Sequence, residues 1–158
     1  GVYDYVLDHD RQIVNGCDDS VVMVVKEQTI MLRRARGYAP MSVTLPFALR
    51  HNTLAMGANQ KSTVAIGFDD QVILSPHIGD LDSIGSVAYY QKNIQTLERI
   101  YDFTPEVIVH DKHPQYESTK YAMQKGNHEG LPLQAVQHHY AHIVGVMAEK
   151  GIEGQVFG

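Results

Sequence analysis

Short apolar runs rich in β-branched residues recur along the chain, and they predict its strands. Lys26-Glu27-Gln28 separates the first two runs, which we interpret as a hairpin. Pro40 and Pro46 then predict irregular structure and the end of one module. An antiparallel meander is expected from Asn52 onward. The predicted strands are residues 20–25, 29–34, 54–56, 62–67, 71–75, 106–109, 133–136 and 155–157.

A second spacing, in which apolar residues recur every three or four positions, predicts helices. It is clearest between Ser86 and Tyr101, where one face would be apolar. We expect further helices over residues 117–125 and 138–150, with Gly126-Asn127 and Gly151 as their C-terminal ends. The fold class is therefore α/β. Three antiparallel strands followed by α/β units is the order of a ribonuclease-H-like lobe, the half-unit of the actin-like ATPases.

Composition narrows the functional classes. Hydrophobic residues make up 44% of the chain, enough for a core, and the net charge of −5 argues against binding nucleic acid through a basic surface. No apolar run approaches the ~20 residues of a membrane span. The single cysteine, Cys17, excludes an internal disulfide, so we expect a cytoplasmic protein. Because the sequence starts at Gly1 and stops just after an apolar segment, we also expect a fragment of a larger protein.

The strongest chemical signal is the segment VQHHYAHIVGVMAE, residues 136–149. His138 and His142 are four apart, so on a helix both imidazoles project from one face at the spacing that two ligands of one metal ion need. A helix N-terminus favours the neutral imidazole, which is the form that binds metal. A catalytic metal usually takes about three protein ligands, and no third is obvious nearby. A phosphate contact, or a mixture of packed and surface histidines, remains the alternative.

Other polar segments follow predicted strands, and each also has a plain structural interpretation. Residues 57–63 form a glycine turn whose backbone and Lys61 could face phosphate, or simply a hairpin. Asp80 could hold a magnesium ion or a water, or cap a turn. His113 lies in a polar loop where α/β proteins bind ligands, or in a solvated loop. Ser20 and the nearby arginines suit a phosphate or adenylate, or a charged surface strand.

Six motifs in one order resemble the HypF family of carbamoyltransferases, which act in nickel–iron hydrogenase maturation. They are DDSVV, LRRARGYAP, LAMGANQKST, SPHIGDL, HDKHPQYEST and VQHHYAH, and they cover nearly the whole chain. The resemblance implies a ribonuclease-H-like (actin-like ATPase) lobe with a mixed sheet, preceded by the β-rich tail of a YrdC-like domain. Residues 1–46 would be the C-terminal part of the YrdC-like domain, and residues 50–158 the incomplete first lobe of a TsaD-like domain.

The resemblance also implies substrates, partners and residue roles. The complete enzyme would use carbamoyl phosphate and ATP to form carbamoyl-adenylate, then pass the carbamoyl group to the C-terminal cysteine of HypE. The metal could be zinc, iron or magnesium. By position, the adenylate-forming half would contain Asp19, Ser20, Arg33, Arg34 and Arg36; the phosphate-facing hairpin, Lys61 and Thr63; and the metal pair, His138 and His142. We also predict that Asp80 and His113 are catalytic. His139 is the weaker member of the histidine cluster.

The chain departs from the family pattern at Gly16 and Met23, where the family usually has arginine. The family's other modules, a further metal ligand and the second ATPase lobe lie outside this sequence, so we expect this chain alone not to complete the reaction. One alternative is a non-catalytic interaction module that keeps the lobe and forms a homodimer through the face that the second lobe would cover. A TsaD-like tRNA-modifying protein is another, against which the acidic charge and the YrdC-type tail argue.

Overall fold

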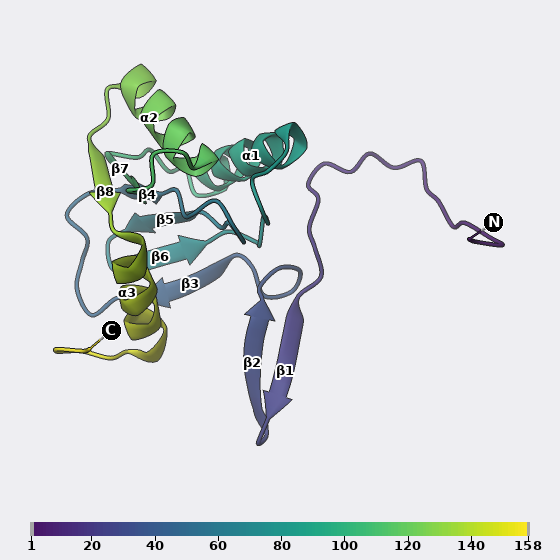
Figure 1. Ribbon diagram of the computed structural model, residues 1–158, viewed down its shortest axis with the longest axis horizontal. Coiled ribbons are helices and arrows are strands. Elements are labelled where there is room, and N and C mark those ends of the chain that lie inside the picture. The colour runs from purple at the N-terminus through teal and green to yellow at the C-terminus, as the bar shows by residue number, and fades with distance from the viewer. Residues whose placement is uncertain (1, 158) are drawn as a thin grey trace.

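The computed structural model describes residues 2–157 and shows a mixed six-stranded sheet with three helices, a separate hairpin and an extended N-terminal segment (Figure 1). The hairpin pairs β1 with β2 around a turn at Lys26 and Glu27. The elements are β1 Val21–Val25, β2 Gln28–Arg33, β3 Met41–Thr44, β4 Thr53–Ala55, β5 Ala65–Phe68, β6 Gln71–Leu74, α1 Ile84–Ile100, β7 Val107–Asp111, α2 Glu117–Glu129, β8 Leu133–Val136 and α3 His138–Lys150.

The sheet combines a meander with two α/β units. Strands β4, β5 and β6 are antiparallel neighbours, while β7 pairs in parallel with β4, and β8 in parallel with β7. The strand order is β3-β6-β5-β4-β7-β8. This arrangement confirms the α/β fold and the mixed sheet that the sequence predicts after residue 50.

One face of the sheet carries the core. Leu54, Ile66 and Ile108 are fully buried there, and they pack with Tyr90 and Ile94 of α1 in one cluster. Because successive strand residues point to opposite faces, their neighbours Ala55, Ala65 and Val109 face the other side. That side carries α3, which has no fully buried residue. The α1–α2 face is therefore packed, whereas α3 covers the opposite face only in part.

The expectation of irregular structure around Pro40 and Pro46 is wrong for the four residues of β3. This strand pairs antiparallel with β6, with Met41 opposite Leu74. Both prolines lie outside the strand, so neither removes a hydrogen bond from the ladder. By sequence β3 falls in the predicted first domain, and by pairing it joins the sheet of the second. The division of the chain at residues 46–50 stays a prediction.

One predicted helix end and one predicted strand are also wrong. Helix α2 does not stop at Gly126-Asn127 but continues to Glu129 and ends at Gly130, whose φ of 69° is left-handed. Gly126 serves close packing instead, because a Cβ there would lie 2.8 Å from Leu133 Cδ2 on β8. The strand predicted at residues 155–157 does not form; these residues are irregular.

Candidate metal centre

Parallel pairing brings the ends of β7 and β8 to one edge of the sheet. Asp111, the last residue of β7, lies opposite Val136, and the Lys112 N–H donates to the Val136 carbonyl at 3.0 Å. Helix α3 begins at His138, directly after Gln137. Its first turn therefore lies beside the end of β7, although the two segments are far apart in the sequence.

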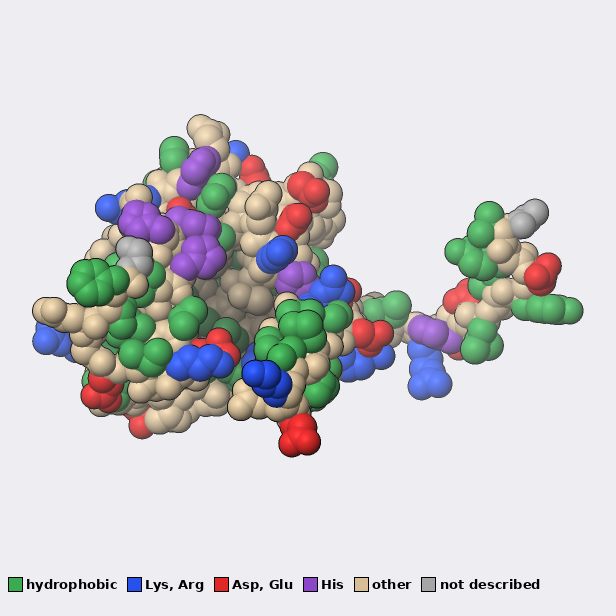
Figure 2. Space-filling view, turned by 60° about the horizontal axis from the view of Figure 1, so that its bottom comes forward, with side chains coloured by type: hydrophobic (Ala, Val, Ile, Leu, Met, Phe, Trp, Pro, Cys, Tyr) green, Lys and Arg blue, Asp and Glu red, His purple; other side chains and the backbone are tan. Residues whose placement is uncertain are grey.

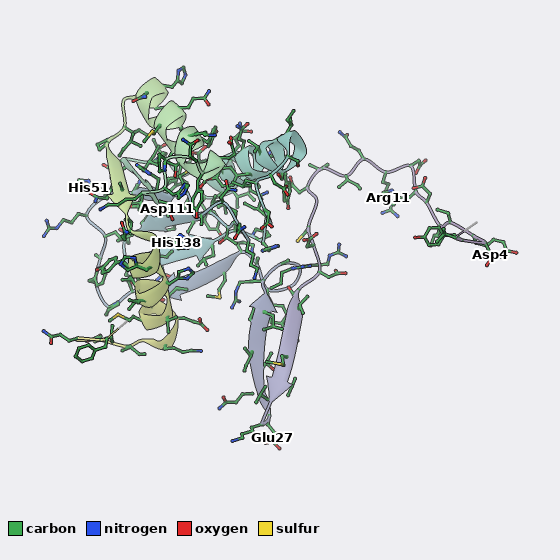
Figure 3. The ribbon with its side chains drawn as sticks, in the orientation of Figure 1. Asp4, Arg11, Glu27, His51, Asp111 and His138 are labelled. Atoms are coloured by element: carbon green, nitrogen blue, oxygen red, sulfur yellow. The ribbon has the colours of Figure 1, made fainter. Side chains whose placement is uncertain are left out.

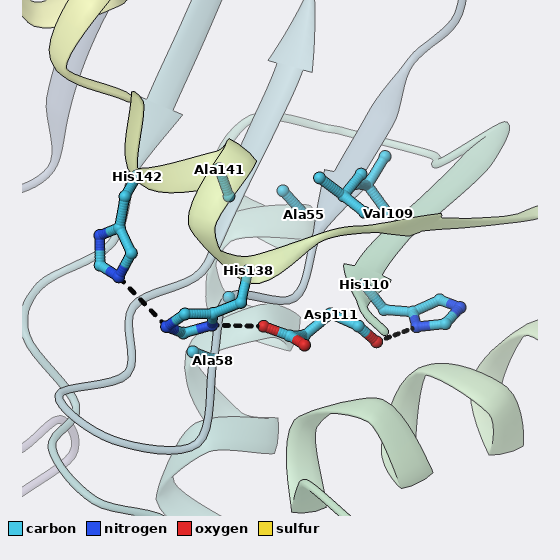
Figure 4. Close-up of a pocket in the computed structure, with 10 residues that line it drawn as sticks. Ala55, Ala58, Val109, His110, Asp111, His138, Ala141 and His142 are labelled. Carbon is cyan, nitrogen blue, oxygen red and sulfur yellow. Dashed lines mark hydrogen bonds and ion pairs between the residues drawn. The ribbon is translucent and has the colours of Figure 1, made fainter. Parts of the chain in front are cut away.

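A cleft of about 280 Å³ opens at this edge. Its small and apolar lining includes Ala55, Gly57 and Val109, and its polar lining includes Asp111 and the two histidines of α3, His138 and His142. Figure 4 shows Ala55, Val109, Asp111 and the two histidines around the cleft. In the space-filling view, several histidine side chains gather on one face beside a hollow (Figure 2).

The two predicted metal ligands converge on one point. The Nε2 atoms of His138 and His142 lie 3.1 Å apart. Two nitrogens bonded to one zinc ion at ~2.0–2.1 Å, with an angle between right and tetrahedral, lie about 2.8–3.4 Å from each other. The separation in the structure falls within that range, so the geometry of the pair is compatible with one shared metal ion. Metal binding itself stays a prediction.

Asp111 holds one member of the pair. Its Oδ2 lies 2.6 Å from His138 Nδ1, and its Oδ1 accepts the N–H of His113 at 2.8 Å. Figure 3 shows Asp111 and His138 next to each other. The Asp111 side chain is only 7% exposed, against 46% for His138. Both carboxylate oxygens thus have partners within the protein.

Sequence reasoning missed Asp111 as an individual site residue, although its segment was recognised as polar. The available signal was an acidic residue at the end of a buried strand, followed by a helix and then a second strand. Across residues 2–157, no group of three or more His, Cys, Asp or Glu side chains is arranged to hold a metal ion. The described part of the chain therefore offers the two histidines as ligands, with Asp111 behind one of them.

His113, predicted to be catalytic, is connected to the histidine pair by an aromatic residue that contacts both His113 and His138. Its ring stacks on Tyr116 with 4.2 Å between ring centroids, and Tyr116 meets His138 edge-on at 6.3 Å. The His113 Nδ1 accepts the Gln115 N–H at 3.3 Å. The structure thus brings the rings of His113, Tyr116 and His138 together.

Asp80 and Lys61 are also brought together, although not as two free catalytic groups. Asp80 Oδ1 accepts the backbone N–H of Lys61 at 2.7 Å. Lys61 has a φ of 47°, an unfavourable region for a residue with a side chain. The contact therefore stabilises the turn that precedes Thr63, and it leaves the ammonium group of Lys61 on an exposed residue.

The predicted adenylate residues lie on another part of the chain, and none of them lines the histidine cleft. Two of the arginines face acidic neighbours: Arg33 lies 3.9 Å from Asp18, and Arg36 lies 3.6 Å from Asp19. The Ser20 hydroxyl accepts the Ala35 N–H and donates to the Arg36 carbonyl, both at 2.9 Å. The Ser20 hydroxyl is therefore occupied by hydrogen bonds to backbone groups.

Arg34 marks the junction between the hairpin and the sheet. Its carbonyl accepts the N–H of His77 at 2.8 Å. Burial, and then the positive charge of Arg33, lower the pKa of His77 below its usual value. The imidazole at this junction is accordingly neutral at neutral pH, which limits the repulsion between it and the surrounding cations.

Comparison with known proteins identifies the family. The sequence model described as the HypF Kae1-like domain matches residues 48–149, which is most of the chain. The chain belongs to the HypF family. Carbamoyltransferase HypF from Synechocystis sp. is 47% identical over 158 residues, a match that covers 99% of this chain and 20% of that protein. Carbamoyltransferase HypF2 from Cupriavidus necator is 37% identical, covering 100% of this chain and 20% of its own length.

Solved HypF structures share the fold. A crystal structure of full-length HypF in the phosphate- and nucleotide-bound form superposes with a TM-score of 0.86 at 38% identity, over 96% of this chain and 24% of that one. T. kodakarensis HypF superposes with a TM-score of 0.83 at 35% identity. The match covers 92% of this chain and 19% of that one. The chain spans about a fifth of the length of the curated HypF proteins it matches. Within residues 2–157, no helix is long and apolar enough to cross a membrane.

We predict that Gly57→Ala destabilises the turn beside the cleft, because Gly57 has a φ of 65° and an added Cβ would lie 2.1 Å from the Thr63 carbonyl oxygen. The strain should lower the free energy of unfolding by about 1–3 kcal/mol. Gly145→Ala is the matched control, since a Cβ on this helical glycine meets nothing within 4 Å. It should be neutral or stabilise by up to about 1 kcal/mol. Urea unfolding followed by circular dichroism measures both, and equal effects would contradict the turn geometry.

Proposed function

We propose that this chain supplies part of the metal and phosphate site of an ATP-dependent carbamoyltransferase. The complete protein would form carbamoyl-adenylate from carbamoyl phosphate and ATP, then transfer the carbamoyl group to the C-terminal cysteine of HypE. One observation carries the proposal: the Nε2 atoms of His138 and His142 lie 3.1 Å apart beside a cleft, in a chain of the HypF family. The names of the curated relatives as carbamoyltransferases support the reaction class.

The proposed transfer step has a simple balance. The HypE thiolate would attack the carbamoyl carbon, so that a carbon–sulfur bond forms and gives a thiocarbamate. The bond between the carbamoyl carbon and the phosphate oxygen breaks, and AMP leaves. A divalent cation held by His138 and His142 would neutralise charge on phosphate oxygens. The chain's own contribution is to hold those two imidazoles in place and to present Lys61 and Thr63 on a fixed turn as phosphate contacts.

The other predicted roles fit the geometry to different degrees. Asp80 is best explained as the residue that fixes the phosphate-facing turn, through its bond to the Lys61 N–H. His113 is proposed to act beside the cleft, where it stacks on Tyr116. The arginines of the hairpin side, Arg33, Arg34 and Arg36, are proposed to stabilise the adenylate and its leaving pyrophosphate.

We propose that the chain belongs to two domains, with residues 1–46 in a YrdC-like domain and residues 50–158 in a TsaD-like lobe. We also propose that this chain alone is inactive, because residues 2–157 place two histidines together where a catalytic metal usually takes about three ligands. The third ligand and the second side of the nucleotide site are assigned to the rest of the protein, which we propose to be cytoplasmic.

Metal titration tests the site. Zinc or ferrous ion titrated into the chain should bind weakly, and His142→Ala should weaken binding by at least about tenfold because it removes one of two ligands. His139→Ala is the matched control, since it deletes an adjacent imidazole of the same helical turn and should leave the affinity unchanged. Equal affinities of the wild type and His142→Ala would refute the site, and so would a loss that His139→Ala reproduces.

An interaction module is the second candidate function, and exposed apolar surface favours it. All five residues of β1 are exposed, and Tyr140 and Val146 on α3 are 59% and 54% exposed. Unpartnered apolar surface of this kind commonly marks a contact between chains.

This candidate predicts self-association. Static light scattering should then give an average mass that rises from monomer to dimer over about a hundredfold range of concentration, as mass action requires. The variant Val146→Asp would oppose the association by placing a charge in the apolar surface, and Glu153→Gln serves as an exposed control outside the strands and helices. A constant monomer mass across the range would count against the interaction module.

A further inference from the structure

Three side chains around the histidine pair contact one another in sequence, each through a defined atom. Asp111 is bonded to His138 through Nδ1, and His138 faces His142 through Nε2 (Figure 4). We propose that Asp111 is a positioning residue that keeps His138 in the tautomer with the proton on Nδ1, so that the Nε2 lone pair faces the metal position in advance. The inference rests on the proposed metal role of the pair and adds the residue that prepares it.

Asp111 is well held for such a role. It lies at the end of β7, and its backbone carbonyl accepts the Thr119 hydroxyl at 3.1 Å and contacts His110 Nδ1 at 2.7 Å. Its own carboxylate is nearly inaccessible, and one oxygen is fixed by the His113 N–H. The second oxygen is thus presented to His138 from a residue that three neighbours restrain.

Proton counting gives the tautomer. A neutral imidazole carries one ring proton, and an ionised carboxylate can only accept hydrogen bonds. The 2.6 Å contact between Asp111 Oδ2 and His138 Nδ1 therefore places the proton on Nδ1. His138 Nε2 is left with a lone pair, which can accept a hydrogen bond from His142 Nε2 across the 3.1 Å that separates them.

Direct metal ligation by Asp111 does not fit the same contacts. Both of its oxygens already have partners, and its contact is with the Nδ1 side of His138, whereas His142 lies at Nε2. Carboxylates that hold the second nitrogen of a histidine ligand fix the ring and commonly raise metal affinity about 10–100-fold. Asp111 is thus expected to act through His138.

The test compares Asp111→Ala and Asp111→Asn with wild type, and with Asp10→Asn as a control that removes the same charge from the exposed N-terminal segment. The first readout is the tautomer of His138, taken from long-range proton–nitrogen NMR spectra of the metal-free chain at about pH 8, where histidine is ordinarily neutral. Wild type and Asp10→Asn should show the Nδ1–H form. Asp111→Ala should shift His138 toward the Nε2–H form, and Asp111→Asn should give a mixture.

The second readout is the zinc dissociation constant. Asp111→Ala should raise it about 10–100-fold, and Asp111→Asn should raise it by at least about threefold, because a neutral amide oxygen is a weaker acceptor. Asp111→Asn keeps the size of the side chain and an acceptor for the His113 N–H. It therefore decides the question if the amide spectrum shows that Asp111→Ala does not fold.

The inference is overturned if the folded Asp111 variants keep the Nδ1–H form of His138 and bind zinc within about twofold of wild type. A different result would overturn the proposed metal site: unchanged zinc affinity in both His138→Ala and His142→Ala. In that case the tautomer readout still decides whether Asp111 orients His138. The two failures are therefore distinguishable.

Discussion

The parallel register between β7 and β8 is the constraint on which the candidate site depends. It sets Asp111 opposite Val136, so that α3 starts beside the end of β7 and His138 meets the Asp111 carboxylate. Because strand side chains alternate between faces, a shift of one residue would turn Asp111 away from α3. The buried residues Ile108 and His110 point to the packed side of the same strand and hold this register.

Helices cover the two faces of the sheet to different extents, and the candidate site lies on the less covered face. Leu54, Ile66 and Ile108 are enclosed by α1 and α2, whereas the alternate residues Ala55 and Val109 remain partly exposed beside α3 and line the histidine cleft. The buried face under α1 and α2 thus lies directly behind the more exposed face that lines the cleft. This division agrees with the proposal that further parts of the protein complete the site, as the curated relatives are about five times longer than this chain.

The sequence predicted what depends on local spacing and missed what depends on distant pairing. His138 and His142 could be placed together because four residues on a helix bring two side chains to one face. Asp111 could not, since its contact with His138 spans 27 residues and follows from the pairing of two strands. The same reason hid β3, whose partner β6 is remote and whose flanking prolines indicate a loop. Gly126 seemed to end α2, but its role is close packing against Leu133.

The central claim is that His138 and His142 bind one metal ion through Nε2 atoms that the fold has already brought together. X-ray absorption spectroscopy at the zinc edge, on the zinc-loaded chain, tests it most directly. If the pair binds zinc, the spectrum should show two imidazole nitrogens at ~2.0–2.1 Å from the metal, with oxygen ligands completing the shell. A spectrum with at most one imidazole, or with sulfur from Cys17 at ~2.3 Å, would contradict it.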